Sequence, residues 1–266
     1  MPGFRTTSRS EQDMDVLVRG SVTTQDIAYV QHTVAEYLRP GLAADHLKVK
    51  LAEYHGGDRT ALCVAQVNVE HAGRLVRAQE AAGSVAAAAD RAAEALPSRV
   101  RRLDRHLRAA RTGPPSFTGE RWDRRRARGF PFTVKAGSRS RGLVRHKAYP
   151  LAVQDPGTAA LTLDLRDYDF HLFTEDASGQ DTVVYRAGDT GYRLAAPRPA
   201  AVGEPSCGIP VIVDAAPMPV LTLPEAVRTL DTGGVPFLPF VGVGTGRGAV
   251  LYRRFDGHLG LVTPLW

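Results

Sequence analysis

Hydrophobic and polar positions alternate with two different periods between residue 14 and residue 111, and these periods predict strands and helices in a definite order. Leu47, Val49 and Leu51 alternate with Lys48 and Lys50, which is the pattern of a half-buried strand with both lysines on its polar face. Further strands are predicted near residues 16–20, 61–70 and 74–80, and helices over residues 24–38 and 84–111. One sheet with both helices on a single face satisfies this β-α-β-β-β-α order.

The ends of the two predicted helices carry recognisable signals. Thr23 precedes Asp26 at a capping-box spacing, which predicts the start of the first helix, and Pro40 predicts its end. The second helix begins at Ser84 in an alanine-rich segment that contains Pro97, so we expect this helix to be kinked or restarted there.

The second half of the chain is an internal repeat, in which the segment that begins near Asp155 recurs from Thr222 onward. Each copy begins with a helix N-cap, at Asp155 and Thr222, and continues with three short predicted strands. Identical residues recur at one constant offset, without gaps, among them Asp164/Asp231, Phe170/Phe237, Phe173/Phe240, Gly179/Gly246, Val183/Val250, Tyr185/Tyr252, Arg186/Arg253 and Leu194/Leu261.

Each copy is too small to bury its own apolar face, so the two copies are predicted to pair with each other in a pseudo-dimer. The fold class is therefore α+β, with an N-terminal domain followed by a basic linker and two small tandem α+β repeats. The predicted segments are a disordered tail (1–13), the N-terminal domain (14–111), the linker (112–142), repeat 1 (143–197), a connection (198–208) and repeat 2 (209–266). The repeated apolar residues predicted for the interface are Phe170, Phe173, Val183, Tyr185, Phe237, Phe240, Val250 and Tyr252.

Positive charge is concentrated in one fifth of the chain. The protein carries 34 basic and 28 acidic residues, a net charge of +6, whereas residues 97–147 alone hold 16 basic and 3 acidic residues, a net charge of +13. The rest of the chain is therefore acidic, and the basic segment predicts a polyanionic partner. A solvated basic surface without a partner is the alternative explanation.

Arginines recur at helical spacing in the second predicted helix, where they would form one exposed line. Guanidinium groups bind phosphate through several donors, and a line of them gives salt-dependent binding to RNA. The predicted RNA-binding residues are Arg101, Arg102, Arg105 and Arg108 on the helix, with Lys48, Lys50 and Arg77 extending the surface across the sheet. Weaker contacts are predicted from the linker arginines Arg124, Arg125, Arg126 and Arg128.

Other kinds of site find little support. The glycine-rich segment 242–248 has no helix after it and aligns with an ordinary hairpin turn of repeat 1, which argues against a nucleotide site. The histidines lack metal-binding spacing, Cys63 lies on an apolar strand face, and no converging catalytic residues are evident. We therefore expect no enzyme activity, no metal, no cofactor and no small-molecule substrate. The sequence also has no apolar run long enough to cross a membrane and no secretion signal, so a cytoplasmic location is expected.

Two segments resemble the long-form ribosome hibernation-promoting factors, also known as the ribosome-associated inhibitor or sigma-54 modulation family, and most closely those of the actinobacterial type. The helix segment 102–108 (RLDRHLR) is similar to the basic helix of that family. The pattern Asp169-Phe170-His171-Leu172-Phe173, then Gly179, then Val183-Val184-Tyr185-Arg186 is similar to that of its C-terminal domain.

The resemblance implies a non-enzymatic protein that binds the small ribosomal subunit and its 16S rRNA, where messenger and transfer RNA bind, and inhibits translation under stress or dormancy. It also implies that Arg102, Arg105 and Arg108 contact ribosomal RNA. In ordinary long forms the single C-terminal domain dimerises and joins two ribosomes. Because this chain holds two such domains that can pair internally, we expect an isolated monomer that acts on single ribosomes.

Three other functions are compatible with the charge pattern. A general binder or chaperone of structured RNA needs only the basic helix and linker. A ribosome-dimerising factor would need a free face on the repeats. A modulator of transcription would bind polymerase or sigma factor and ignore ribosomal RNA.

Overall fold

The computed structural model describes residues 5–6, 14–38, 46–55, 61–112, 142–187, 191–205, 209 and 211–265. They fall into two compact units: the first runs from the N-terminus to Gly113 and includes Asp164–Asp167, and the second holds the rest. The linker arginines Arg124, Arg125, Arg126 and Arg128 lie outside the described residues.

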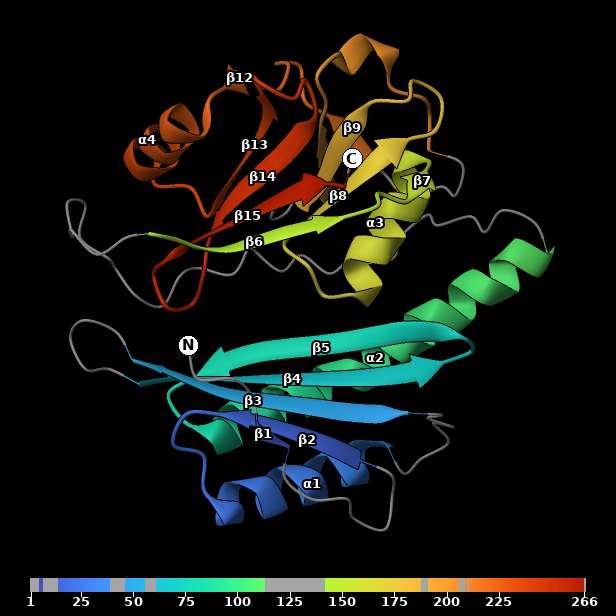
Figure 1. The fold of residues 1–266 in the computed structure, drawn as a ribbon. Coiled ribbons are helices and arrows are strands. Elements are labelled where there is room, and N and C mark those ends of the chain that lie inside the picture. Colours follow the sequence, from blue (N-terminus) through green and yellow to red (C-terminus); the bar gives the residue numbers. More distant parts are fainter. Residues whose placement is uncertain are drawn as a thin grey trace. The chain divides into compact units, whose positions relative to one another are not determined.

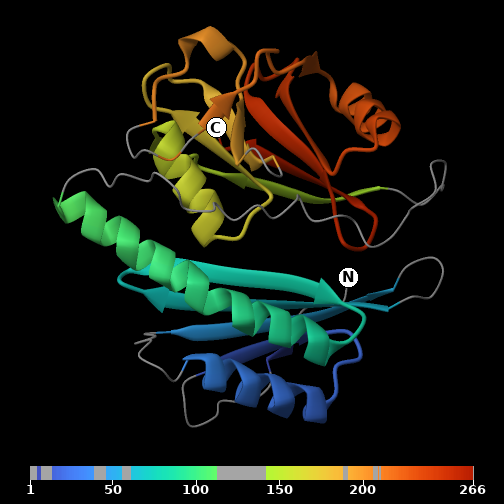
Figure 2. The ribbon, with the colours of Figure 1, turned by 180° about the vertical axis from the view of Figure 1, so that it is seen from behind.

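The first unit is a five-stranded sheet with both helices on one face (Figures 1 and 2). Its strands are ordered β1-β2-β3-β4-β5, and only the β2–β3 pair, which α1 connects, is parallel. The α+β fold class is thus confirmed. The elements are β1 (Arg5–Thr6), β2 (Met14–Arg19), α1 (Thr24–Leu38), β3 (Leu47–His55), β4 (Ala61–His71), β5 (Arg74–Ala82) and α2 (Val85–Thr112).

The predicted helix starts are confirmed by their side-chain contacts. The backbone N–H of Asp26 donates to Thr23 Oγ1 at 3.1 Å, and the Thr23 backbone N–H donates to Asp26 Oδ2 at 3.0 Å. Ser84 caps α2, since its Oγ accepts from the Ala87 N–H at 3.2 Å. These side chains satisfy donors that have no partner within the helix.

Two expectations for the first unit need correction. Helix α2 continues through Pro97 as one element and does not restart there, because buried residues on both sides of the proline, Leu96, Val100 and Leu103, hold it in place; a kink at Pro97 stays a prediction. The strand Arg5–Thr6 pairs with β2, inside the segment expected to be a disordered tail.

The second unit contains two sheets with matching strand orders. Repeat 1 supplies β7 (Val153–Gln154), α3 (Pro156–Leu165), β8 (Phe170–Glu175), β9 (Asp181–Arg186) and β10 (Tyr192–Ala195). Repeat 2 supplies β12 (Val220–Leu221), α4 (Leu223–Gly233), β13 (Phe237–Gly242), β14 (Gly248–Arg253) and β15 (Leu259–Pro264). The predicted helix and three strands occur in both copies, each with one additional short strand ahead of its helix.

The two repeats exchange their first strands. Strand β6 (Leu143–Tyr149) begins repeat 1 but pairs with β15 of repeat 2, and β11 (Val211–Val213) begins repeat 2 but pairs with β10 of repeat 1. The registers match: Leu194 pairs with Val213, and their equivalents in the other copy, Leu261 and His146, pair in the same way. The exchange ties each sheet to the other copy.

Candidate nucleic-acid interface and repeat interface

A continuous line of exposed residues follows α2. Arg101, Arg105 and Arg108 are exposed as predicted, and the line extends toward the start of the helix through Ser98, Glu94 and Arg91 at alternating spacings of three and four positions. Since such positions lie on one side of a helix, the arginines share one surface. Arg91 was missed in the sequence, although extending the same spacing backwards would have found it.

Asp104, the acidic residue between Arg101 and Arg105, faces the sheet. Asp104 Oδ1 lies 2.8 Å from Nε2 of His71, at the end of β4. Both side chains are partly buried. The carboxylate of Asp104 is therefore held away from the exposed line, and the stretch of the line from Arg101 to Arg108 keeps its basic character.

Arg102 differs from its neighbours. It is half-buried, whereas Arg101 and Arg105 are exposed. Of the four helix arginines predicted to bind RNA, Arg102 is thus the least accessible.

Lys48, Lys50 and Arg77 lie on the other face of the sheet. Val49 and Ala78 are fully buried on the helix-covered face, and side chains alternate along a strand, so the three basic residues face away from α2. Lys48 and Arg77 both flank Asn68 in the strand register, and Arg77 Nε donates to Asn68 Oδ1 at 3.3 Å. The expected single surface is therefore wrong: the predicted residues form two surfaces separated by the sheet.

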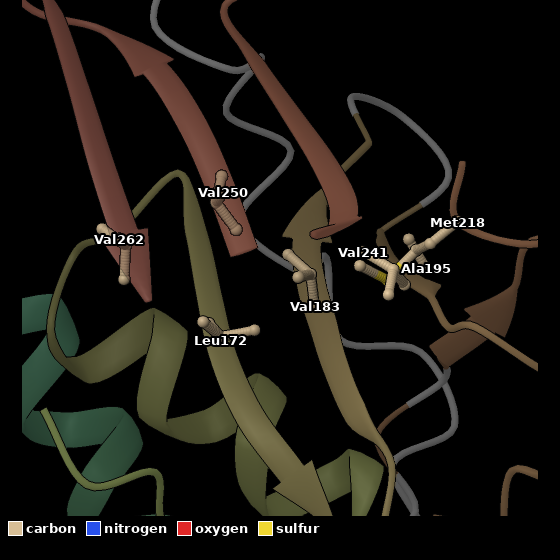
Figure 3. Packing of buried hydrophobic residues seen from close by; sticks show 7 residues of the cluster. All are labelled: Leu172, Val183, Ala195, Met218, Val241, Val250 and Val262. Atoms are coloured by element: carbon tan, nitrogen blue, oxygen red, sulfur yellow. The ribbon is translucent and has the colours of Figure 1, made fainter. Parts of the chain in front are cut away.

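A shared apolar core joins the two repeats. Figure 3 shows Leu172, Val183 and Ala195 of repeat 1 packed with residues from repeat 2. The complete buried cluster is Leu172, Val183, Ala195, Met218, Val241, Val250 and Val262, with Phe170, Tyr185, Phe237 and Tyr252 packed against it.

Four aromatic rings form the centre of this repeat interface. The Phe170 and Phe237 centroids are 5.0 Å apart. Phe170 also lies 5.6 Å from Tyr252, and Phe237 lies 5.6 Å from Tyr185, so each contact has its equivalent in the other copy. Tilted pairs at these distances are favourable aromatic arrangements.

Two of the eight residues predicted for the interface lie elsewhere. Phe240 packs beneath α4 with Ala226 and Leu230. Phe173 is fully buried beside His171, at a centroid distance of 5.8 Å. Because alternate residues of a strand face opposite sides, Phe173 and Phe240 point away from the face that carries Phe170 and Phe237.

Polar contacts also cross between the repeats. Arg247 Nε of repeat 2 donates to Asp181 Oδ2 of repeat 1 at 2.6 Å, and this contact raises the pKa of Arg247. Asp214, which follows β11, accepts from Tyr185 Oη at 2.8 Å and from Arg193 Nε at 2.7 Å. Burial together with the Asp214 hydrogen bond raises the pKa of Tyr185 to about 12.

The glycine-rich segment 242–248 is the turn between β13 and β14. Gly246 has φ +63°, and Gly179, its equivalent in repeat 1, has φ +67°, so both turns use the left-handed backbone that favours glycine. A tight hairpin therefore accounts for these glycines.

The described residues contain no cluster of three or more His, Cys, Asp or Glu side chains suited to a metal ion. Within the same part of the chain, no helix is both long and apolar enough to span a membrane.

Comparisons with known proteins cover most of the chain. Residues 139–194 and 211–261 each match the family model described as Sigma 54 modulation/S30EA ribosomal protein C terminus, so both repeats carry this domain. The dormancy associated translation inhibitor of Mycobacterium tuberculosis, from the strains CDC 1551 and H37Rv, is 32% identical over 97% of this chain and 90% of its own length. The solved Protein Y N-terminal domain of Thermus thermophilus is 26% identical over 33% of this chain and 93% of its own length, with a TM-score of 0.27, which is too low to establish a shared fold.

Proposed function

This chain belongs to the family of long-form ribosome hibernation-promoting factors, whose C-terminal domain is the sigma 54 modulation/S30EA domain, and from that premise we propose that it is a ribosome-associated translation inhibitor. Members of this family are not enzymes. The proposed binding site is the mRNA and tRNA decoding region of the small subunit, with 16S rRNA as the direct partner. Its relative in Mycobacterium tuberculosis is named for translation inhibition in dormancy, and we extend that role to this chain.

The exposed line on α2 is the observation that carries the proposal. Arg101, Arg105 and Arg108 present three guanidinium groups on one surface, while Asp104 is turned toward His71. Each guanidinium that neutralises a phosphate releases counterions, so the binding free energy falls steeply with salt. Such a surface suits structured RNA, which proteins recognise largely by shape and backbone.

Lys48, Lys50 and Arg77 form a second basic surface on the opposite face of the first unit. We propose this surface as a second, weaker contact to RNA. The linker arginines, including Arg124 and Arg128, remain proposed contacts on the basis of their charge.

The exchanged strands support action on single ribosomes. The place beside β10 or β15 that the first strand of a second molecule could take is occupied by β11 or β6 of the same chain, and the shared core is buried. A chain whose repeats already exchange these strands with each other needs no second copy to complete the pairing. The isolated protein is therefore proposed to be a monomer.

A sucrose gradient with purified, vacant ribosomes tests the proposal. At near-physiological salt the protein should sediment with single intact ribosomes, and Arg105→Glu should release it. Arg228→Glu is the matched control, since Arg228 is an exposed arginine on α4 in the other unit. A shift to ribosome dimers would keep the function and refute the monomeric action, and protein left at the top of the gradient would refute ribosome binding. Competition by unrelated duplex RNA at similar concentration would favour a general RNA binder.

A further inference from the structure

Equivalent residues of the two repeats meet each other at two places. In a twofold arrangement a residue contacts its own counterpart only next to the symmetry axis. Phe170 meets Phe237 in this way, and so does Asp181 at the start of β9 with Gly248 at the start of β14. The pseudo-twofold axis of the second unit therefore passes beside both pairs.

The site where positions 181 and 248 meet has room for one aspartate and one glycine. The Asp181 carboxylate is buried, and it accepts hydrogen bonds from Arg247 Nε at 2.6 Å, from Arg247 Nη2 at 3.2 Å and from the Gly248 backbone N–H at 2.9 Å. Thr174 Oγ1 lies 3.5 Å away and adds a weaker contact. A Cβ atom built on Gly248 would lie 2.6 Å from the Asp181 Cβ, a distance that real Cβ atoms do not tolerate.

A second pair of positions differs in charge between the copies. Asp214, next to β11, binds Arg193 and Tyr185 of repeat 1. In the other copy the equivalent of Asp214 is Lys147, on β6, and the equivalent of Arg193 is Gly260. Exchange of the wrong first strand onto repeat 1 would therefore place a lysine against Arg193.

We infer that the two repeats differ so that each pairs with the other repeat and not with a second copy of itself. This inference deepens the proposed action on single ribosomes and rests on the internal pairing proposed there. Two copies of repeat 1 would bring two aspartates together at the axis and a lysine against an arginine, both of which are repulsive. Two copies of repeat 2 would bring two glycines together and leave the arginines at position 247 without the aspartate between them. The residues that set this specificity are Asp181, Gly248, Arg247, Asp214 and Arg193.

Variants of the single chain can place at positions 181 and 248 the two residues that would meet if one repeat paired with a second copy of itself, an arrangement we call a self-pair. Gly248→Asp creates the two aspartates of a repeat 1 self-pair, and Asp181→Gly creates the two glycines of a repeat 2 self-pair. The double variant Asp181→Gly/Gly248→Asp again holds one of each, with these two residues interchanged while Arg247 stays in repeat 2. Gly244→Asp is the control, because Gly244 lies exposed in the same turn and a Cβ there meets nothing within 4 Å.

Urea unfolding of the full-length variants measures the discrimination. Gly248→Asp should lower the folding equilibrium constant by about tenfold or more, because the site is overpacked and doubly charged. Asp181→Gly should have a smaller effect, Gly244→Asp should behave like the wild type, and the double variant should recover most of the loss caused by Gly248→Asp. A double variant that is less stable than Gly248→Asp alone would overturn the inference, and so would a Gly248→Asp variant as stable as Gly244→Asp. These unfolding measurements need no ribosome. They therefore test the pairing of the repeats even if the gradient experiment shows that the protein does not bind ribosomes.

Discussion

Phe170 and Phe237 occupy the same position in the two repeats, and their rings face each other across the repeat interface with centroids 5.0 Å apart. A residue that meets its own counterpart marks the centre of a twofold arrangement. Here both partners belong to one chain, so a contact that two molecules would form in a dimer stabilises a single polypeptide.

Removal of either phenylalanine should destabilise the second unit, and the two losses should not add. Phe170→Ala and Phe237→Ala should each lower the free energy of unfolding by about 2–3 kcal/mol. The double variant should lose about 1 kcal/mol less than the sum, because the ring–ring contact can be lost only once. Urea unfolding of the four proteins gives this coupling. Additive losses would show that the two rings do not interact in solution.

Acid should weaken repeat 1 through Glu175. Burial tends to raise the pKa of this carboxyl, but hydrogen bonds from Ser178, Ala177 and Gly203 outweigh it and hold the pKa below the ordinary value of 4.5. A lowered folded-state pKa contributes stability above the unfolded value, and that contribution is lost as the pH falls through the folded value. Glu175→Gln should therefore cost about 2 kcal/mol at pH 7 and nearly nothing in strong acid. Unfolding curves measured across this pH range check it, and parallel curves at all pH values would contradict it.

Alkali should weaken the repeat interface through Tyr185. Burial and the Asp214 hydrogen bond favour the neutral phenol and raise its pKa to about 12, from an ordinary value of 10. The stabilisation is complete below pH 10 and is lost as the pH rises toward 12. Tyr185→Phe should cost about 1 kcal/mol at neutral pH and reduce the loss of stability in alkali. Tyrosinate absorbance, followed together with unfolding, should show one late-titrating tyrosine fewer in this variant.

Strand alternation accounts for much of what could be predicted from the sequence, including two residues that were assigned wrongly. Phe170 and Phe173 are three positions apart, so a strand must place them on opposite faces, and only Phe170 could reach the other repeat. In the same way, Val49 had to face the helices, so Lys48 and Lys50 had to face away from the arginines of α2. The necessary signal was present in both cases.

The exchange of first strands could not be predicted from the sequence in the same way. Strand β6 is exposed at most positions and has no apolar alternation, so its sequence pattern does not predict a strand. Whether such a strand joins its own repeat or the other depends on the path of the chain between sheets, which no local periodicity encodes. Helix α2 likewise continues through Pro97 because tertiary packing outweighs the local preference to break.

An engineered disulfide should show that the exchanged strands belong to one chain. Ala148 of β6 and Thr263 of β15 are direct neighbours in the parallel register, at a strand spacing of about 4.8 Å that suits a disulfide. In a background with serine at Cys63 and Cys207, Ala148→Cys/Thr263→Cys should oxidise to a monomer on non-reducing electrophoresis at every protein concentration. Ala148→Cys alone should remain unlinked. Covalent dimers from the double variant would show exchange between molecules.

The length of the basic line on α2 should be visible in the salt dependence of ribosome binding. Arg91 and Arg108 lie about 26 Å apart along the helix, so RNA bound over the whole line would contact both ends. Arg91 has an acidic neighbour on the line, Glu94, and its Nη1 donates to the Ala81 carbonyl at 3.3 Å, so its contribution should be smaller than that of Arg105. Where an arginine neutralises one phosphate, its replacement by glutamine should reduce the slope of log Kobs against log salt by about 1. We expect a reduction of this size for Arg105→Gln, a smaller one for Arg91→Gln, and none for Arg228→Gln. A slope that responds to Arg105 but not to Arg91 would confine the RNA contact to the C-terminal half of the helix.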